Sequence, residues 1–131
     1  MGVRCYVISG ISRIVIEEIT RGNVRTVELR SAHNVATALR VNVGDCVFLT
    51  TAKSQDVDRG VSGLIAEVTG KEVVTHSLFY TSPHHIEECE MTVVRLRVAP
   101  KAFGRIIRIK PSELLETREA EVIEMTIYDA R

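Results

Sequence analysis

Hydrophobic and polar residues alternate along much of the chain, and a period of two residues is typical of β-strands that bury one face. Short stretches of this kind, some of them continuously apolar, recur from one end of the chain to the other. We expect strands in the segments VRCYVIS, RTVELR, CVFLTT, SGLIAEVTG, KEVVTHSLFY, MTVVRLRVAP, GRIIRIK and EVIEMTIYDA. Gly70 is expected to separate the fourth of these segments from the fifth. Strands therefore dominate the predicted structure.

Two segments replace the alternation with a helical spacing of hydrophobic residues. In residues 12–21, Ser12 can cap a helix and Gly22 can end it. A shorter helix is expected over residues 34–40. The segments KSQDVDRG and SPHHIEECE are rich in polar residues and predict loops. Together the elements predict a mainly β (α+β) fold, a single barrel-like domain over residues 1–131 with two short helices.

The composition is typical of a soluble globular domain. Of the 131 residues, 45% are hydrophobic and 26% are charged, and the chain is long enough to form one core. No apolar run approaches the ~18 residues of a membrane span, and the N-terminus has no signal-peptide features. We therefore expect a cytoplasmic protein without a membrane partner. Cys5, Cys46 and Cys89 form no C-x-x-C pair and are odd in number, which favours reduced thiols.

The net charge of zero hides an uneven distribution of charged residues. Residues 91–110 contain basic residues and no acid, whereas the segment that follows is mainly acidic. If the strands in this segment pair, cations on one face converge into a stripe that could neutralise a phosphate backbone: Arg95, Arg97, Arg108 and Lys110. The alternative is that these cations form ion pairs across a sheet with the C-terminal acids Glu119, Glu121 and Glu124, of which Glu124 falls on the opposite face.

The segment RTVELR carries the other candidate site. If Val27 and Leu29 face the core, then Thr26, Glu28 and Arg30 share the opposite face. The Cα atoms of two alternate residues are about 7 Å apart, so Glu28 can orient Arg30. A flat guanidinium can stack on a base or bind phosphate, and a carboxylate can accept a hydrogen bond from an exocyclic amine. The alternative is a solvated strand face with an incidental ion pair.

The order of elements over residues 20–70 is similar to that of the ASCH branch of the PUA-like superfamily. The matching segments are RTVELR, VGDCVFL and SGLIAEV. The whole chain also resembles a small archaeal family of uncharacterised proteins. The first resemblance implies a PUA/ASCH-like pseudo-barrel with a cleft beside the T-x-E-x-R strand and the first helix, where several relatives receive RNA or a nucleobase-like ligand. We therefore expect such a ligand to contact Arg25, Thr26, Glu28 and Arg30.

Catalysis is the rival expectation. Some ASCH relatives are hydrolases of modified nucleosides that place a lysine just before the threonine of this strand. Arg25 takes that place here, and an arginine keeps its proton and cannot act as a general base. Glu67 could act with Thr26, but the sequence contains no recognisable nucleophile or dinucleotide fingerprint. We favour a binding module over a hydrolase of modified nucleosides or a non-enzymatic assembly module, and leave open whether the chain forms a homo-oligomer.

Metal and cofactor sites are not predicted. One cluster, in SPHHIEECE, has the side-chain types of a metal site, namely His84, His85, Glu87, Glu88 and Cys89. Adjacent histidines in a loop seldom point at one ion, and no second Cys or His pair follows at finger-like spacing. His33 and His76 stand alone and are expected to be structural. We therefore expect no catalytic residue, no metal ligand and no cofactor.

Overall fold

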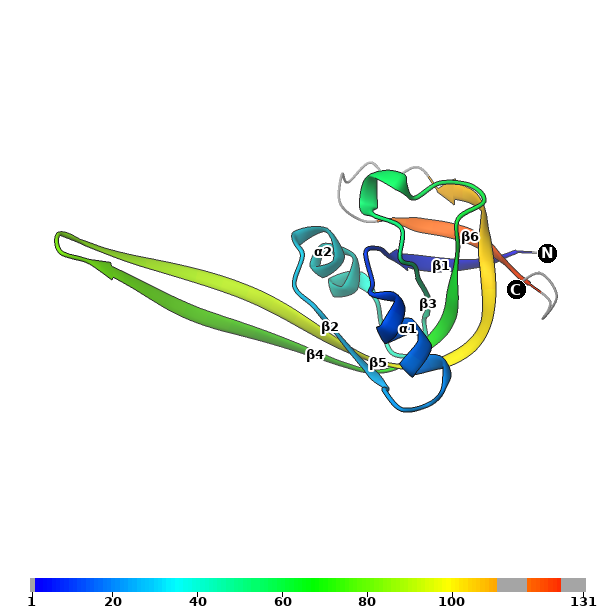
Figure 1. Cartoon of the computed structure of the whole chain (residues 1–131), viewed down its shortest axis with the longest axis horizontal. Coiled ribbons are helices and arrows are strands. Elements are labelled where there is room, and N and C mark those ends of the chain that lie inside the picture. Colours follow the sequence, from blue (N-terminus) through cyan, green and yellow to red (C-terminus); the bar gives the residue numbers. More distant parts are fainter. Residues whose placement is uncertain (1, 111–117, 126–131) are drawn as a thin grey trace.

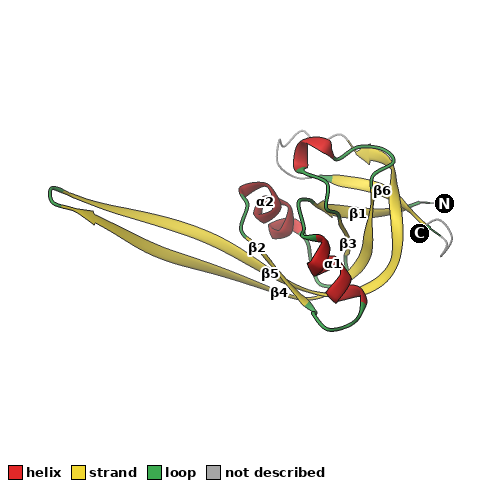
Figure 2. Ribbon diagram, viewed as in Figure 1, coloured by secondary structure: helices red, strands yellow, loops and turns green. Residues whose placement is uncertain are grey.

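The computed structural model describes residues 2–110 and 118–125 of the chain. Figures 1 and 2 show a body built of strands and short helices, from which one long hairpin extends. The elements, in chain order, are β1 (Val3–Ile8), α1 (Arg13–Thr20), β2 (Thr26–Leu29), α2 (Ala32–Arg40), β3 (Cys46–Leu49), the short 3₁₀ helix η1 (Ser54–Asp56), β4 (Ser62–Ser82), β5 (His85–Lys110) and β6 (Glu119–Glu124).

The strands form one sheet that closes on itself. Their order is β2-β5-β4-β3-β1-β6, and β6 also pairs with β5, so that β5, β4, β3, β1 and β6 make a ring. The pairing of β1 with β3 is parallel, and the other pairings are antiparallel. β2 lies outside the ring, against β5. The predicted mainly β fold, with a nearly closed sheet and two short helices, is confirmed.

Alternation along the strands separates two hydrophobic clusters. Cys5, Val7 and Phe48 meet side chains of β5 and β6 in one cluster, which therefore lies inside the ring. The neighbouring side chains Ile8 and Leu49 point the other way and pack with the apolar sides of α1, α2 and β2. The helices thus cover one outer face of the ring and bury it. No helix in the described part of the chain is long and apolar enough to cross a membrane.

The helices begin and end close to where the sequence predicts. Ser12 occupies the N-cap position of α1 but makes no capping hydrogen bond through its side chain. Gly22 follows α1 with φ +80°, a conformation that favours glycine, and its N–H donates to the carbonyl of Ile19 over 3.0 Å. α2 begins before the predicted residue 34, because the Ser31 hydroxyl caps it by accepting from the backbone N–H of Asn34.

The structure of β4 and β5 differs from the sequence prediction at three places. Gly70 does not separate two strands, because β4 continues through it with only a register shift against β5 between Val68 and Gly70. β5 likewise passes Pro100 beside a second register shift, so the chain bends at both places without ending a strand. The predicted SPHHIEECE loop is also wrong. Only residues 83–84 separate β4 from β5, and the acidic residues that follow belong to β5.

The prediction of reduced thiols is wrong for two of the three cysteines. Cys5 on β1 and Cys46 on β3 form a disulfide between neighbouring parallel strands, 41 residues apart in the sequence. Cys89 is a free, exposed cysteine on β5. The disulfide closes a loop that contains α1, β2 and α2. It therefore links β1 covalently to β3, its neighbour in the ring.

Candidate functional site

β2 presents the predicted polar face. Val27 and Leu29 are buried, whereas Thr26 and Glu28 are exposed, as the alternation requires. The Arg30 guanidinium donates to the Glu28 carboxylate through Nε over 3.2 Å and through Nη2 over 3.0 Å. Both side chains are partly open to solvent, so this pair adds little to stability. The pair instead fixes the orientation of Arg30, because two hydrogen bonds to Glu28 hold the plane of the guanidinium beside the strand.

A cleft of about 440 Å³ opens at the end of β2. Its lining comes from four parts of the chain: the turn after β1, the end of β2, the first turn of α2 and the loop that contains η1. The residues are Ser9, Gly10, Ile11, Glu28, Leu29, Arg30, Ser31, His33, Asn34, Lys53, Ser54 and Gln55. The volume lies within the range of small-molecule sites. Glu28 and Arg30 thus line the cleft, whereas Arg25 and Thr26 lie outside its lining.

Asn34 fixes the floor of this cleft. Its side-chain amide donates to the Ser9 carbonyl over 2.8 Å, and its side-chain oxygen accepts from the Ser9 backbone N–H over 3.1 Å. Both residues are buried, so the two hydrogen bonds satisfy backbone groups that water does not reach. The start of α2 is therefore held against the end of β1. Sequence reasoning missed this residue, because its partner is 25 positions away.

The cleft has an excess of positive charge. Two cations, Arg30 and Lys53, line it together with a single carboxylate, that of Glu28, and the positive end of α2 begins at Ser31 on the same rim. Lys53 forms no ion pair with any described residue. The loop that carries Lys53 is anchored by Arg118, whose Nη1 donates to the Ser54 carbonyl over 2.7 Å. Sequence reasoning missed Lys53, which looked like one polar loop residue among several.

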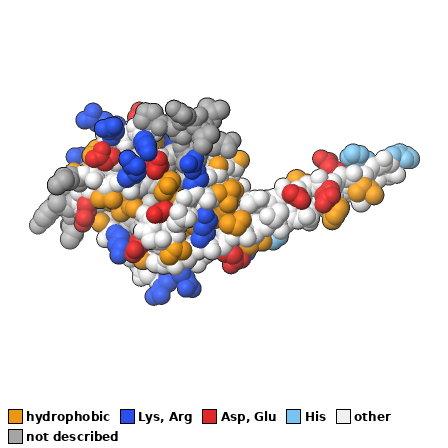
Figure 3. Space-filling model, turned by 180° about the vertical axis from the view of Figure 1, so that it is seen from behind, with side chains coloured by type: hydrophobic (Ala, Val, Ile, Leu, Met, Phe, Trp, Pro, Cys, Tyr) orange, Lys and Arg blue, Asp and Glu red, His pale blue; other side chains and the backbone are white. Residues whose placement is uncertain are grey.

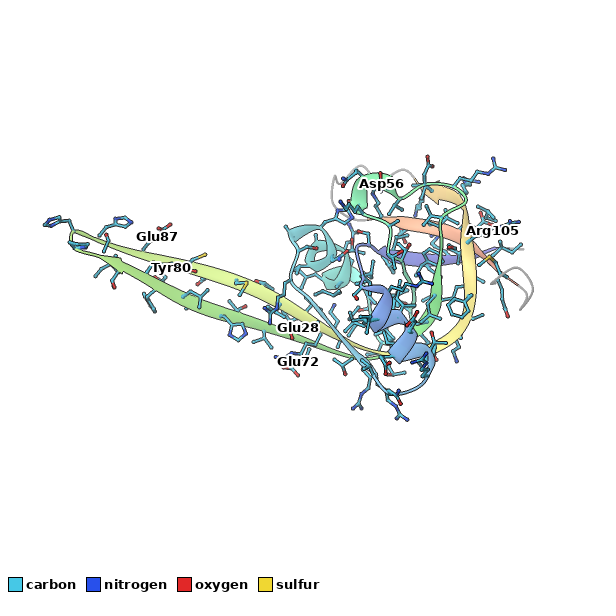
Figure 4. All side chains as sticks on the ribbon, viewed as in Figure 1. Glu28, Asp56, Glu72, Tyr80, Glu87 and Arg105 are labelled. Atoms are coloured by element: carbon cyan, nitrogen blue, oxygen red, sulfur yellow. A yellow bond between two sulfur atoms is a disulfide. The ribbon has the colours of Figure 1, made fainter. Side chains whose placement is uncertain are left out.

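The four cations of the basic segment do not converge. Arg95 and Arg97 lie opposite Glu28 and Thr26 on β2. Arg95 also forms an ion pair with Glu72 over 3.2 Å. Glu72 and Glu28 lie at the root of the hairpin in Figure 4. Because β5 is one continuous strand, the other two cations lie at its far end, against β6. There Lys110 forms an ion pair with Glu119 over 3.2 Å, as the alternative predicted.

A second hollow, of about 370 Å³, lies at that far end of β5. Three cations and one acid line it, together with Gly2 and Ala120: Arg4, Arg108, Lys110 and Glu121. Glu121 is in register with Arg4 on one side and with Arg108 on the other. Because Glu121 lies between Arg4 and Arg108 in the sheet and Lys110 is paired with Glu119, we rank this hollow below the cleft beside β2.

The residues considered for catalysis and metal binding are separated. Glu67 forms an ion pair with Lys101 over 3.4 Å and lies opposite Ala99, whereas Thr26 lies opposite Arg97 on another strand pair. Within the described residues, no group of three His, Cys, Asp or Glu side chains is placed to hold a metal ion. Burial raises the pKa of the Tyr6 phenol above its ordinary value, and the nearby Glu119 adds to the increase, but Tyr6 does not line the cleft.

Fold and cleft together define a small, mainly β protein with a ring-shaped sheet, a long hairpin and a cleft at the end of β2. The chain belongs to the family of proteins of unknown function DUF473, whose model matches residues 3–120. The prediction of a small uncharacterised family is thus confirmed. An uncharacterized protein of Methanocaldococcus jannaschii is 22% identical over 106 residues, which cover 81% of this chain and 66% of that protein. The match therefore spans just under two thirds of the relative's length.

Proposed function

We propose that the protein binds a small, anionic, nucleobase-containing ligand in the cleft beside β2, without catalysing a reaction on it. The observation that carries this proposal is the lining of the cleft, where Arg30, Lys53 and the start of α2 accompany the carboxylate of Glu28. The cations suit a phosphate group, and the carboxylate suits an exocyclic amine of a base. The resemblance to the PUA-like superfamily implies a ligand beside the same strand. It implies a cleft next to the first helix, however, whereas this cleft is lined by the start of α2 and by no residue of α1.

A mononucleotide fits the charge distribution better than a long RNA. An RNA backbone needs a continuous series of cations, and the predicted series is divided between the two ends of β5. Arg95 and Lys110 are moreover engaged with acids. Of the four residues expected to bind a ligand, Glu28 is therefore assigned to the base and Arg30 to the phosphate. Arg25 and Thr26 receive no role, because they do not line the cleft.

Calorimetric titration with the four ribonucleoside 5′-monophosphates and the corresponding nucleosides tests the proposal. At least one monophosphate is expected to bind more tightly than its nucleoside. Arg30→Ala and Glu28→Gln should each weaken that binding by about 5- to 150-fold, since each removes a directional hydrogen bond to a charged group, worth about 1–3 kcal/mol. Arg25→Ala is the matched control, because it removes an exposed arginine of the same segment that does not line the cleft.

Two outcomes would contradict the proposal. One is the absence of binding by any of these ligands. The other is equal loss from Arg25→Ala and Arg30→Ala, which would indicate general electrostatic attraction. A parallel titration with a mixed-sequence RNA pool tests the RNA alternative. If the protein binds RNA instead, Arg108→Ala should weaken binding to all RNA sequences and reduce the salt dependence of that binding, while the mononucleotides would not bind.

A further inference from the structure

The hairpin formed by β4 and β5 projects far beyond the body. Residues 72–94, called the arm from here on, include a stretch from Thr75 to Glu90 in which every residue is exposed. Figure 1 shows the arm leaving the body as two strands, with no third strand beside it along its outer part. A two-stranded hairpin of this kind is marginally stable in water unless something packs against it. The arm therefore has the features of an element that is completed by a partner.

Large hydrophobic side chains are exposed on both faces of the arm. Register pairs share a face, so Ile86 lies with Thr81 on one face, near Phe79, and Leu78 and Tyr80 lie on the other. Tyr80 projects from the outer part of the arm in Figure 4. Ile86 is 73% exposed, the largest exposed fraction among the large hydrophobic residues of the described chain. Neither face of the arm is a purely polar, solvent-facing surface.

The edges of the arm are also open. β3 pairs with β4 only as far as Glu67, and β2 pairs with β5 only as far as Val94. Beyond these residues, the outer edges of both strands have no strand partner within the described chain. Unpaired N–H and C=O groups along a strand edge readily pair with another strand.

Charge divides the molecule into an acidic arm and a basic remainder. All 17 Lys and Arg residues lie outside the arm, whereas four of the 17 Asp and Glu residues lie within it: Glu72, Glu87, Glu88 and Glu90. With neutral histidines the arm therefore carries a formal charge of −4, and the rest of the chain carries +4. In Figure 3, Lys and Arg lie on the body, where acids are also present, whereas the arm shows acids, histidines and hydrophobic residues. The chain is thus electrostatically complementary to a second copy of itself.

We propose that two copies of this chain associate through antiparallel arms, with the tip of each arm against the root and body of the other. Arms that met tip to tip would bring the acids of both copies together. Antiparallel arms instead bring Glu87 and Glu88 toward a root that carries Arg25 and Arg97, next to Arg95, which is paired with Glu72 of its own chain. From Gly70 to Ser82 the hairpin spans about 40 Å, long enough for the open edges and hydrophobic faces of both arms to meet. Such a two-fold contact is self-complementary and closes.

Sedimentation velocity of the full chain over a range of concentrations tests the association with a matched pair of variants. Ile86→Gln removes an exposed isoleucine from the arm, and Ile14→Gln removes one that is 70% exposed on α1. The wild type is expected to form a dimer, and Ile86→Gln should raise its dissociation constant by at least about tenfold. Ile14→Gln should change it by less than about twofold. A monomer at every concentration, or equal effects of the two variants, would overturn the proposal.

The double variant Glu87→Gln/Glu88→Gln tests the antiparallel direction through the sign of its effect. Acids that face the basic root of the partner stabilise the dimer, so their removal should weaken it several-fold and reduce its sensitivity to salt. Acids that face each other destabilise the dimer, so their removal would strengthen it. Glu124→Gln, an exposed acid of β6, should cause no weakening. A dimer that is unchanged or strengthened by the double variant would refute the antiparallel arrangement.

Discussion

Replacing Asn34 by alanine tests whether the cleft is held by one side chain. Asn34 makes a reciprocal pair of hydrogen bonds with the backbone of Ser9, at 2.8 Å and 3.1 Å, and both residues are more than nine-tenths buried. Alanine can make neither bond. The Ser9 N–H and C=O would then lose their partner in a place that solvent hardly reaches, between the end of β1 and the first turn of α2.

The magnitude follows from the two orphaned groups. A buried donor or acceptor left unsatisfied costs about 1–3 kcal/mol, so Asn34→Ala should lower the free energy of unfolding by about 2–4 kcal/mol if some water enters the gap. That is a large part of the roughly 5–15 kcal/mol that stabilises an ordinary domain. Equilibrium unfolding in urea, followed by circular dichroism, measures the loss as a lower transition midpoint.

Asn23→Ala is the matched control. The side-chain amide of Asn23 also donates one hydrogen bond over 2.8 Å, to Glu18, but both groups are exposed and can bond to water instead. Its removal should change the free energy of unfolding by less than about 0.5 kcal/mol. If the two variants lost the same stability, Asn34 would not organise the cleft. A ligand that bound the Asn34 variant as tightly as the wild type would refute that role independently.

Two further predictions concern the body of the protein. Reduction of the disulfide between Cys5 and Cys46 should lower the free energy of unfolding by up to about 4 kcal/mol for a loop of this length, and a thiol assay on the unfolded, unreduced chain should detect Cys89 alone. Gly63→Ala should lower the free energy of unfolding by about 1–3 kcal/mol, because a Cβ there would lie 2.5 Å from the Leu49 carbonyl oxygen. Gly70→Ala should lower the free energy of unfolding by less in the same urea assay, because its Cβ would lie 3.3 Å from the nearest atom, the Cβ of Arg97.

Local patterns were sufficient to predict the two helices and the faces of β2. Alternation placed Val27 and Leu29 in the core and Glu28 on the surface, and each of these side chains is where the pattern requires. Gly22 ended α1 for the reason that the sequence suggested, a positive φ. These features depend on neighbours within a few residues, and such neighbours can be read from the sequence. The polar face of β2 was therefore predictable, although its role as part of a ligand site is still a prediction.

Long-range pairing could not be predicted in the same way. The disulfide joins strands 41 residues apart, and nothing in the local sequence indicates that Cys46 becomes the neighbour of Cys5. The same limit affected the basic segment. Arg95 and Lys110 lie on one continuous strand, and a bulge beside Pro100 carries that strand from β2 at one end to β6 at the other. A proline usually indicates the end of a strand, so the sequence predicts two strands here, and the four cations would converge only if those two strands paired.

The arm shows why a polar sequence does not have to be a loop. SPHHIEECE looked like a connection because its acids and histidines gain nothing from a core, but strands need only backbone partners and can leave both faces in water. On the opposite strand, KEVVTHSLFY is rich in β-forming residues, and it holds the acidic segment in register up to the pair of Ser82 with His85. The cost of this arrangement is an exposed Phe79 and Ile86 at the tip. A monomer gains nothing from those side chains there, whereas a dimer of antiparallel arms would bury them.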